Sequence, residues 1–205
     1  MTGTQAYWEK IYSTKGPTEV SWFSPHLQTS LDLIQRAATN PCASIMDVGG
    51  GESTLVDDLI ALGYQNITVM DISHVAVEHT KKRLGPASDA VKWLVVDVIR
   101  AELPERSYDI WHDRAVFHFL TEPAQRLAYV RQVASSVKRG GHVVVGTFGP
   151  EGPTTCSGLD TMRYDAESLH GEFGPSFRLI ESSKELHRTP SGTTQQFLYC
   201  YCVVE

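Results

Sequence analysis

Apolar runs of strand length alternate along most of this sequence with segments of helical periodicity. Runs of this length suit strands that are buried on both faces, and the segments between them are long enough for the crossovers that parallel strands need. The predicted strands are 44–48, 67–70, 91–96, 108–112 and 142–148. The predicted helices between them are 55–62, 75–84 and 124–137. The alternation therefore predicts an α/β fold with one doubly wound, mostly parallel sheet.

The two ends of the chain break this alternation. Residues 149–158 form a Gly/Pro-rich loop, a short helix is predicted at 165–170, and two long strand-like runs at 177–186 and 195–204 predict a terminal hairpin. Before the first strand, 5–12 and 25–38 are predicted to be helices that cover one end of the sheet.

Composition excludes several classes of protein. The chain has 205 residues, 41% of them hydrophobic and 20% charged, with a net charge of −6, which is typical of a globular protein and unfavourable for binding a nucleic-acid backbone. The first residues do not have the basic segment and following apolar segment of a signal peptide, and no apolar stretch is long enough to span a membrane. A cytoplasmic protein without a membrane partner is therefore expected. The cysteines lack metal-ligand spacing, and no metal is expected.

The segment that follows the first predicted strand is the strongest functional signal. Asp47 is followed by Gly49, Gly50 and Gly51, and then by Ser53 and Thr54 at the start of a predicted helix. Glycines allow a sharp turn and a close approach of a ligand to the main chain, and the start of a helix offers free N–H groups. The segment predicts a site for a nucleotide-like ligand.

Details of this segment favour one kind of nucleotide-like ligand over another. A dinucleotide fingerprint needs a third glycine where this chain has Thr54, and a P-loop needs a Gly-Lys-Ser/Thr that is absent here. The carboxylate of Asp47 would repel a pyrophosphate but would pair with the ammonium group of a methionine moiety, directly or through water.

Two further acids are predicted to end neighbouring strands. Asp71 ends the second strand, where a carboxylate accepts hydrogen bonds from both ribose hydroxyls. Asp97 ends the third strand, where a carboxylate accepts from an adenine amino group; a role as a turn cap is the alternative. Ile72 and Val98, which follow these acids, complete the predicted site.

The order Asp47-x-Gly49-x-Gly51, Asp71, Asp97 and Tyr108-Asp109-Ile110 resembles the class I S-adenosylmethionine-dependent methyltransferases. The resemblance implies a Rossmann-like, seven-stranded sheet of order 3-2-1-4-5-7-6 with an antiparallel last strand. It implies S-adenosyl-L-methionine as cofactor and S-adenosyl-L-homocysteine as product. One domain over 1–205 is expected, with a helical cap (1–40), a cofactor-binding core (44–148) and a substrate-side segment (149–205).

A narrower resemblance rests on residues before the first predicted strand and after the second. Tyr7-Trp8-Glu9, Trp22-Phe23 and Asp71-Ile72-Ser73 are similar to methyltransferase-like enzymes that modify lysines on elongation factor 1A and citrate synthase. Those enzymes carry Asp-Lys-Gly-Thr after the fourth strand, where this chain has Asp113-Arg114-Ala115-Val116. The pattern also looks like small bacterial methyltransferases of unassigned substrate.

The acceptor is expected to face the segment after the fourth strand. His118 is the first candidate for a general base, with a structural histidine as the alternative. Asp113 is a candidate for holding the methionine end or orienting the acceptor, and Arg114 for clamping an acidic substrate; a structural Asp113–Arg114 ion pair is the alternative. Trp22, with neighbouring aromatic residues, is expected to close over the sulfonium or to form a hydrophobic cap.

The expected function is therefore methyl transfer by in-line displacement to a small-molecule nucleophile that is uncharged or anionic, with O, S or N as the attacking atom. A protein lysine methyltransferase is one alternative and should have an acidic, open groove at the Asp113 end. A non-catalytic module that binds S-adenosylmethionine or supports assembly, and an NAD-dependent oxidoreductase, are the others. Nucleic acid is not expected as a partner, and the chain is expected to be a monomer or a homodimer.

Overall fold

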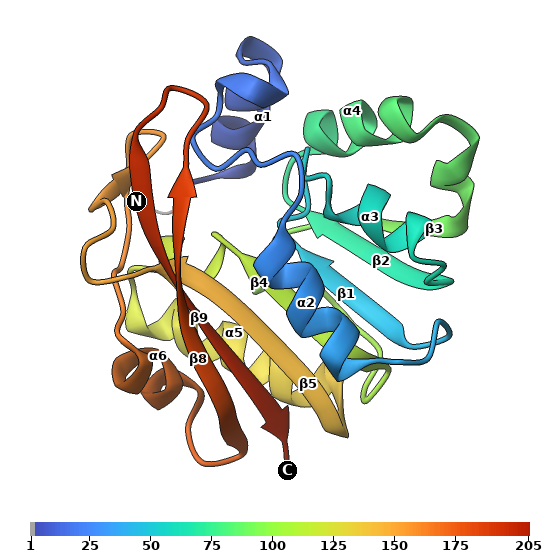
Figure 1. Cartoon of the computed structure of the whole chain (residues 1–205), viewed down its shortest axis with the longest axis vertical. Coiled ribbons are helices and arrows are strands. Elements are labelled where there is room, and N and C mark those ends of the chain that lie inside the picture. Colours follow the sequence, from blue (N-terminus) through green and yellow to red (C-terminus); the bar gives the residue numbers. More distant parts are fainter. Residues whose placement is uncertain (1–2) are drawn as a thin grey trace.

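The computed structural model describes residues 3–205 and has one seven-stranded sheet at its centre (Figure 1). The strand order is β3-β2-β1-β4-β5-β9-β8. Strands β1 to β5 run parallel to one another, and β9 runs antiparallel to both β5 and β8. The strands are β1 (Ser44–Val48), β2 (Asn66–Asp71), β3 (Val91–Val95), β4 (Tyr108–Arg114), β5 (Val137–Phe148), β8 (Phe177–Arg188) and β9 (Thr194–Val204). Because the last two strands of the chain occupy the sixth and seventh places in this sheet, the predicted order is confirmed.

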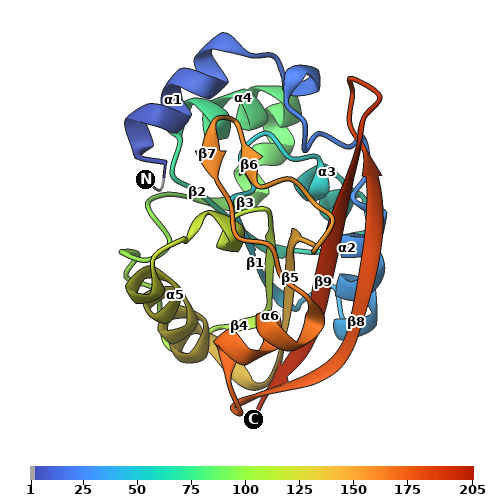
Figure 2. The same ribbon diagram turned by 90° about the vertical axis from the view of Figure 1, so that its left-hand side faces the viewer.

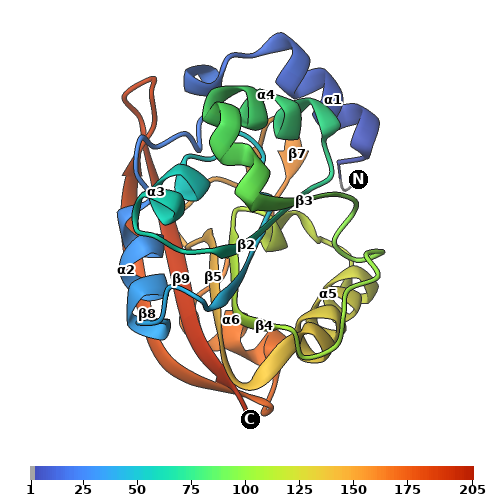
Figure 3. The ribbon, with the colours of Figure 1, turned by 90° about the vertical axis from the view of Figure 1, so that its right-hand side faces the viewer.

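Helices cover both faces of the sheet, and α2 and α5 lie on opposite sides of it (Figure 2 and Figure 3). The α-helices are α1 (Gln5–Thr14), α2 (Gln28–Ala37), α3 (Leu55–Ala61), α4 (His74–Leu84), α5 (Pro123–Ser136) and α6 (Ala166–Phe173). Short 3-10 helices are η1 (Pro17–Glu19), η2 (Gly85–Ala90) and η3 (Phe117–Phe119). Apolar side chains of α2 and α3 pack with β1 and β2, and those of α5 and α6 pack with β4, β5 and β9. Within residues 3–205, no helix is long and apolar enough to cross a membrane.

The helix boundaries follow from local capping chemistry. The Ser73 hydroxyl accepts a hydrogen bond from the Ala76 N–H at the start of α4, and Asp165 forms a reciprocal capping box with Ser168 at the start of α6. Gly85, in a left-handed conformation, ends α4. These signals are local, and the predicted elements therefore match the observed ones closely.

Three details differ from the sequence expectation. Strand β5 begins at Val137, because Val137 pairs with Tyr108 before the strand bulges and returns to register at His142. The predicted glycine stop lies inside that bulge. The 149–158 loop runs into a small hairpin of β6 (Thr155–Cys156) and β7 (Leu159–Asp160), and α2 begins at Gln28, after Pro25. None of these changes alters the topology.

Candidate active site

A cavity lies at the carboxyl ends of β1, β2 and β4, beneath α1, with about 830 Å³ of empty space. Its walls come from α1, the loops after β1, β2 and β3, the turn after β4, and the β6–β7 hairpin. The lining residues are Gly3, Trp8, Tyr12, Trp22, Val48, Gly49, Met70, Asp71, Ile72, Val96, Asp97, Val98, Arg114, Ala115, Val116, Phe119, Leu120 and Cys156.

Glycine is required in the turn after β1. Gly49 has a φ of +67°, and a Cβ there would overlap the Val116 side chain. Gly51 has a φ of +34°, and a Cβ there would lie 2.9 Å from Oδ2 of Asp71. Without side chains at Gly49 and Gly51, the loop after β1 fits between Asp71, at the end of β2, and Val116, which follows β4. Gly49 then forms part of the cavity wall.

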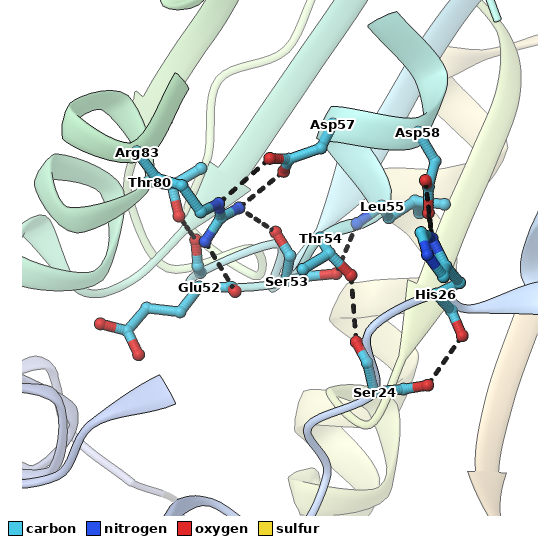
Figure 4. A network of polar contacts seen from close by, with 11 residues as sticks. Ser24, His26, Glu52, Ser53, Thr54, Leu55, Asp57, Asp58, Thr80 and Arg83 are labelled. Carbon is cyan, nitrogen blue, oxygen red and sulfur yellow. Dashed lines mark hydrogen bonds and ion pairs between the residues drawn. The ribbon is translucent and has the colours of Figure 1, made fainter. Parts of the chain in front are cut away.

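Contacts from two directions fix the start of α3 (Figure 4). The Arg83 guanidinium donates to the carbonyl oxygens of Glu52 and Ser53 and pairs with Asp57. The Thr54 hydroxyl donates to the Ser24 carbonyl at 3.0 Å. Ser53 and Thr54, both predicted to bind ligand, therefore serve partly as local anchors: the Ser53 hydroxyl accepts from the Leu55 N–H.

Asp71 lies at the carboxyl end of β2 with only 5% of its surface exposed. Oδ1 accepts a hydrogen bond from the Ser73 N–H at 2.7 Å. Burial raises the pKa of this carboxyl to about 7, against the opposing hydrogen bonds from Ser73 and Gly51. The charges of Asp47 and Glu9 add to the rise. A buried acceptor of this kind, facing the cavity, is matched to a ligand with hydroxyl donors.

Asp97 also lines the cavity, two residues after the end of β3. Its Oδ1 accepts from the Ile99 N–H at 3.1 Å, so it caps the local turn as the alternative interpretation expected. The carboxylate still faces the cavity and keeps acceptor capacity there. Ile72 and Val98 line the same wall.

A second cavity of about 510 Å³ adjoins the first on the Asp47 side, and Glu52, Ser53 and His112 are among its lining residues. Asp47 is 2% exposed and its Oδ1 lies 2.7 Å from Nδ1 of His112, whereas Oδ2 has no hydrogen-bond partner in the described chain. Glu52 is also buried, pairs with His79 through Oε1, and has no partner for Oε2. Two buried carboxylate oxygens without partners fit a ligand that carries a cationic group.

A chain of hydrogen bonds joins Asp47 to Arg114. Nε2 of His112 lies 2.8 Å from the Ser30 hydroxyl, Ser30 lies 3.5 Å from the Tyr199 hydroxyl, and Tyr199 accepts from Nε of Arg114 at 2.9 Å. One arrangement of protons gives each hydroxyl in this chain of hydrogen bonds one donor and one acceptor. In it the Tyr199 hydroxyl donates to the Ser30 hydroxyl, the Ser30 hydroxyl donates to Nε2 of His112, and Nδ1–H of His112 donates to Asp47. The structure thus places His112 beside Asp47, the acid of the first predicted motif.

Helix α1 covers the first cavity and is fastened at both sides. The Glu9 carboxylate accepts from the N–H groups of His74 and Val75 and from the Ser73 hydroxyl, all at the start of α4. Figure 1 shows α1 beside α4, and Figure 2 shows its other side near β6 and β7, where the Tyr7 hydroxyl donates to the Ser157 carbonyl. The aromatic residues predicted to form a lid, including Trp22, therefore lie over the cavity.

Asp113 does not reach either cavity. It is fully buried on the α5 side of β4, where its oxygens accept from the N–H groups of Val116 and Phe117 and from the Tyr129 hydroxyl at 2.6 Å. Burial raises its pKa to about 6, against the hydrogen bonds from Tyr129 and Val116. The alternative of an Asp113–Arg114 pair is not observed, because Arg114 pairs with Glu185 instead. The geometry assigns Asp113 to holding the turn that follows β4.

His118 also lies away from both cavities. The ring is fully buried against Phe119 and Phe148, its Nδ1 accepts from the Phe148 N–H at 3.3 Å, and Nε2 has no partner in residues 3–205. Burial lowers its pKa to about 3, and the Arg114 charge adds to this effect. The base role of His118 stays a prediction, and this placement argues against it.

The turn after β4 carries backbone strain where it meets the cavity. Ala115 lines the cavity with a φ of +72°, a conformation that costs a non-glycine residue about 1–2 kcal/mol, and its N–H donates to the Gly146 carbonyl at 2.9 Å. Sequence reasoning missed Ala115, Phe119, Cys156 and the Glu9 anchor. The Phe119 and Cys156 contacts join segments that are far apart in the chain, and no local pattern marks them. No group of three or more His, Cys, Asp or Glu residues with metal-binding geometry occurs within the described part of the chain.

The comparisons with known proteins agree with this geometry. The family described as "Methyltransferase domain" matches residues 45–141. The mouse eEF1A lysine and N-terminal methyltransferase is 26% identical over 142 residues, which are 69% of this chain and 20% of that protein. Human EEF1A lysine methyltransferase 2 is 23% identical over 193 residues, 87% of this chain and 76% of that protein. This chain thus spans about a fifth of the length of the mouse relative.

Solved structures resemble the whole fold. The N-methyltransferase NodS from Bradyrhizobium japonicum, in complex with S-adenosyl-L-homocysteine, has a TM-score of 0.74 at 15% identity, covering 98% of each chain. At this level of identity the likeness establishes the shared fold.

Proposed function

We propose that this chain is a class I S-adenosylmethionine-dependent methyltransferase that transfers a methyl group from S-adenosylmethionine to a small nucleophile in the cavity beneath α1. One observation carries the proposal: the acids Asp71 and Asp97 follow neighbouring parallel strands and face a single cavity whose lid is aromatic. Asp71 is suited to a ribose diol, Asp97 to an adenine amino group, and the aromatic faces to a sulfonium.

The residues fit this cofactor along its whole length. Asp71 is proposed to accept from the ribose hydroxyls and Asp97 from the adenine amino group, with Ile72 and Val98 against the adenine. Asp47 is proposed to receive the methionine ammonium, because its buried Oδ2 has no partner in the described chain. The missing Cβ of Gly51 leaves space beside Asp71. The bound cofactor would supply an electrophilic methyl carbon on a positively charged sulfur that departs as a neutral thioether.

The protein's own contribution is orientation and exclusion of water. Trp8, Tyr12, Trp22 and Phe119 pack together above the cavity with ring centroids 5.2 to 6.4 Å apart, edge to face in every pair except the tilted Trp8–Tyr12 pair. Such a lid holds the reacting atoms in line and removes water from the acceptor side, which is where methyl transfer gains most of its rate. Release of the product, S-adenosylhomocysteine, then requires α1 to open or the Glu9 contacts to break.

A protein lysine methyltransferase is the second candidate, favoured by the names of the two eEF1A relatives. That activity calls for an acidic groove near Asp113 to hold an ammonium side chain. Asp113 is instead buried with its oxygens hydrogen-bonded, and Arg114 faces the cavities. This charge distribution supports a small neutral or anionic acceptor.

The proposal is tested by calorimetric titration of the protein with S-adenosylmethionine, S-adenosylhomocysteine and NAD. Binding of the first two without NAD is the expected result, and Asp71→Asn should weaken it by about 1–3 kcal/mol. Asp32→Asn is the matched control, because Asp32 is an exposed residue of α2 that accepts a hydrogen bond from Gln28 and lines neither cavity. A folded protein that binds neither adenosyl compound would refute the cofactor assignment and favour a module without this activity.

Lysine methylation is tested separately with the cofactor supplied. Methyl incorporation into lysine peptides or elongation factor 1A, at a rate that small anionic acceptors do not match, would favour the second candidate. Incorporation into small acceptors alone would reject it.

A further inference from the structure

Arg114 lies where the two cavities meet. Among residues 3–205 it is the only Lys or Arg residue that lines either cavity. Its side chain is 4% exposed and packs on β8 and β9, and it lines the second cavity together with Gly49 and Gly50 of the glycine turn. The guanidinium carbon lies 4.1 Å from the centre of the Phe197 ring. Arg114 ends β4, the middle strand of the sheet, and β1 separates it from the strands β2 and β3 that carry the proposed ribose and adenine contacts.

The contacts of Arg114 fix its orientation and leave donors free for a ligand. Nε donates to Tyr199, Nη1 to the Trp22 carbonyl at 3.1 Å, and Nη2 to Glu185 at 3.3 Å. A guanidinium has five N–H donors, so two remain beyond these three contacts. A rigid, buried fork with free donors suits a planar anion that accepts two hydrogen bonds.

The first cavity offers no proton acceptor on the Arg114 side within the described residues. Besides Arg114, its titratable lining groups are Tyr12, Asp71, Asp97 and Cys156. The acids lie on the cofactor side, burial raises the pKa of Tyr12 well above its ordinary value, and burial raises the pKa of the Cys156 thiol to about 11. A nucleophile that reacts here therefore has to arrive without a proton to lose.

We propose that the acceptor is a carboxylate, held by Arg114 and converted to its methyl ester; this inference rests on the proposed function. A carboxyl group ionises near pH 4 and arrives as an anion that needs no base. One carboxylate oxygen forms a bond to the methyl carbon, the carbon–sulfur bond breaks, and its electron pair stays on sulfur. No proton moves in this step.

The charges of the reactants fit the aromatic cavity. An anionic carboxylate and a cationic sulfonium give two uncharged groups, so charge disappears as the reaction proceeds. A cavity lined by Trp8, Trp22 and Phe119 is a poor solvent for separated charges and favours such a step. An amine acceptor would instead keep the positive charge and would first have to release a proton.

Glu185 supplies a check on this assignment. Its carboxylate takes one Arg114 donor from the β8 side and is only 22% exposed. It competes with an incoming carboxylate for the same guanidinium, so its neutralisation should strengthen carboxylate binding. Loss of Arg114 should have the reverse effect.

The test uses the protein saturated with S-adenosylhomocysteine and titrated with benzoate and phenylacetate, with benzamide and phenylacetamide as neutral isosteres. The carboxylates should bind more tightly than the amides. Arg114→Gln should lower carboxylate affinity by about tenfold or more and remove this preference, and Glu185→Gln should increase it. Equal affinity for acids and amides, or a preference that survives in Arg114→Gln, would overturn the inference.

Two further readouts separate this inference from its rivals. If Arg114→Gln weakens S-adenosylhomocysteine binding and leaves the carboxylate preference unchanged, Arg114 holds the cofactor's own carboxylate and the inference fails. The carboxylate that binds best is then incubated with methyl-labelled S-adenosylmethionine. Label released as volatile methanol by alkali supports a methyl ester, whereas alkali-stable label or none refutes it. Failure of the wild-type protein to bind S-adenosylhomocysteine at all would instead refute the proposed function.

Discussion

Adenosine binding should become about tenfold weaker when the pH falls from about 8 to about 6, because the buried Asp71 gains a proton over this range. Burial raises the pKa of Asp71 to about 7. The ionised carboxylate accepts from two ribose hydroxyls, whereas the protonated form uses one oxygen to hold its own proton. Binding is therefore expected to require the ionised form, and protonation at low pH competes with it.

The magnitude follows from the Asp71 pKa. At about pH 6 roughly one molecule in ten carries an ionised Asp71, and at about pH 8 roughly nine in ten do, which gives the tenfold ratio, or about 1.4 kcal/mol. Binding near pH 7 should also release a fraction of a proton. Adenosine is the suitable ligand, because it carries the ribose hydroxyls without the titrating ammonium of S-adenosylmethionine.

The assay is calorimetry at the two pH values in buffers of different ionisation enthalpy, which reports affinity and proton release together. Asp71→Asn should bind adenosine more weakly and with no pH dependence in this range. Asp113→Asn is the control for the other buried acid, whose pKa is about 6 and which lies outside both cavities; because Asp113 holds the turn after β4, this variant is compared by its pH dependence, which should match that of the wild type. Equal wild-type affinity at both pH values, or the same pH dependence in Asp71→Asn, would refute the reasoning.

Three other substitutions test separate parts of the structure. Glu9→Gln should weaken S-adenosylhomocysteine binding several-fold and speed its dissociation in stopped-flow experiments, because the carboxylate that fastens α1 to α4 is lost; unchanged rates would show that α1 is not a lid. Tyr129→Phe should lower the free energy of unfolding in urea by about 1–3 kcal/mol, since Asp113 loses a buried donor, and a stability equal to wild type would contradict this. His118→Asn should keep its turnover within about twofold if the ring is structural; a loss of about 100-fold in a folded variant would restore it as the base.

The cofactor side of the site was predictable because its signals are local. Asp47, Asp71 and Asp97 each follow a run of apolar residues, and parallel strands bring their carboxyl ends to the same edge of a sheet. The glycines between Asp47 and Thr54 mark the turn by themselves. Knowledge of the strand positions was therefore enough to place these residues around the two adjoining cavities that are proposed to bind the cofactor.

The acceptor side was less predictable. Side chains alternate between the two faces of β4, so His112 and Arg114 point to one side and Asp113 to the other. The sequence shows the alternation but does not show which face meets the cavity. That choice depends on α2, which supplies Ser30, and on β9, which supplies Tyr199. His118 lies beyond the strand, and its burial depends on packing against Phe148 of β5.

By itself the sequence determined the α/β class, the strand order through its resemblance, and the three acids of the proposed cofactor site, because periodicity and strand ends are properties of neighbouring residues. Only the tertiary structure decided that Arg114 faces the cavities, that Asp113 and His118 do not, and that Glu9 fastens α1 over them. These outcomes depend on contacts between segments far apart in the chain, whose partners are chosen by how the helices and the terminal hairpin pack on the sheet.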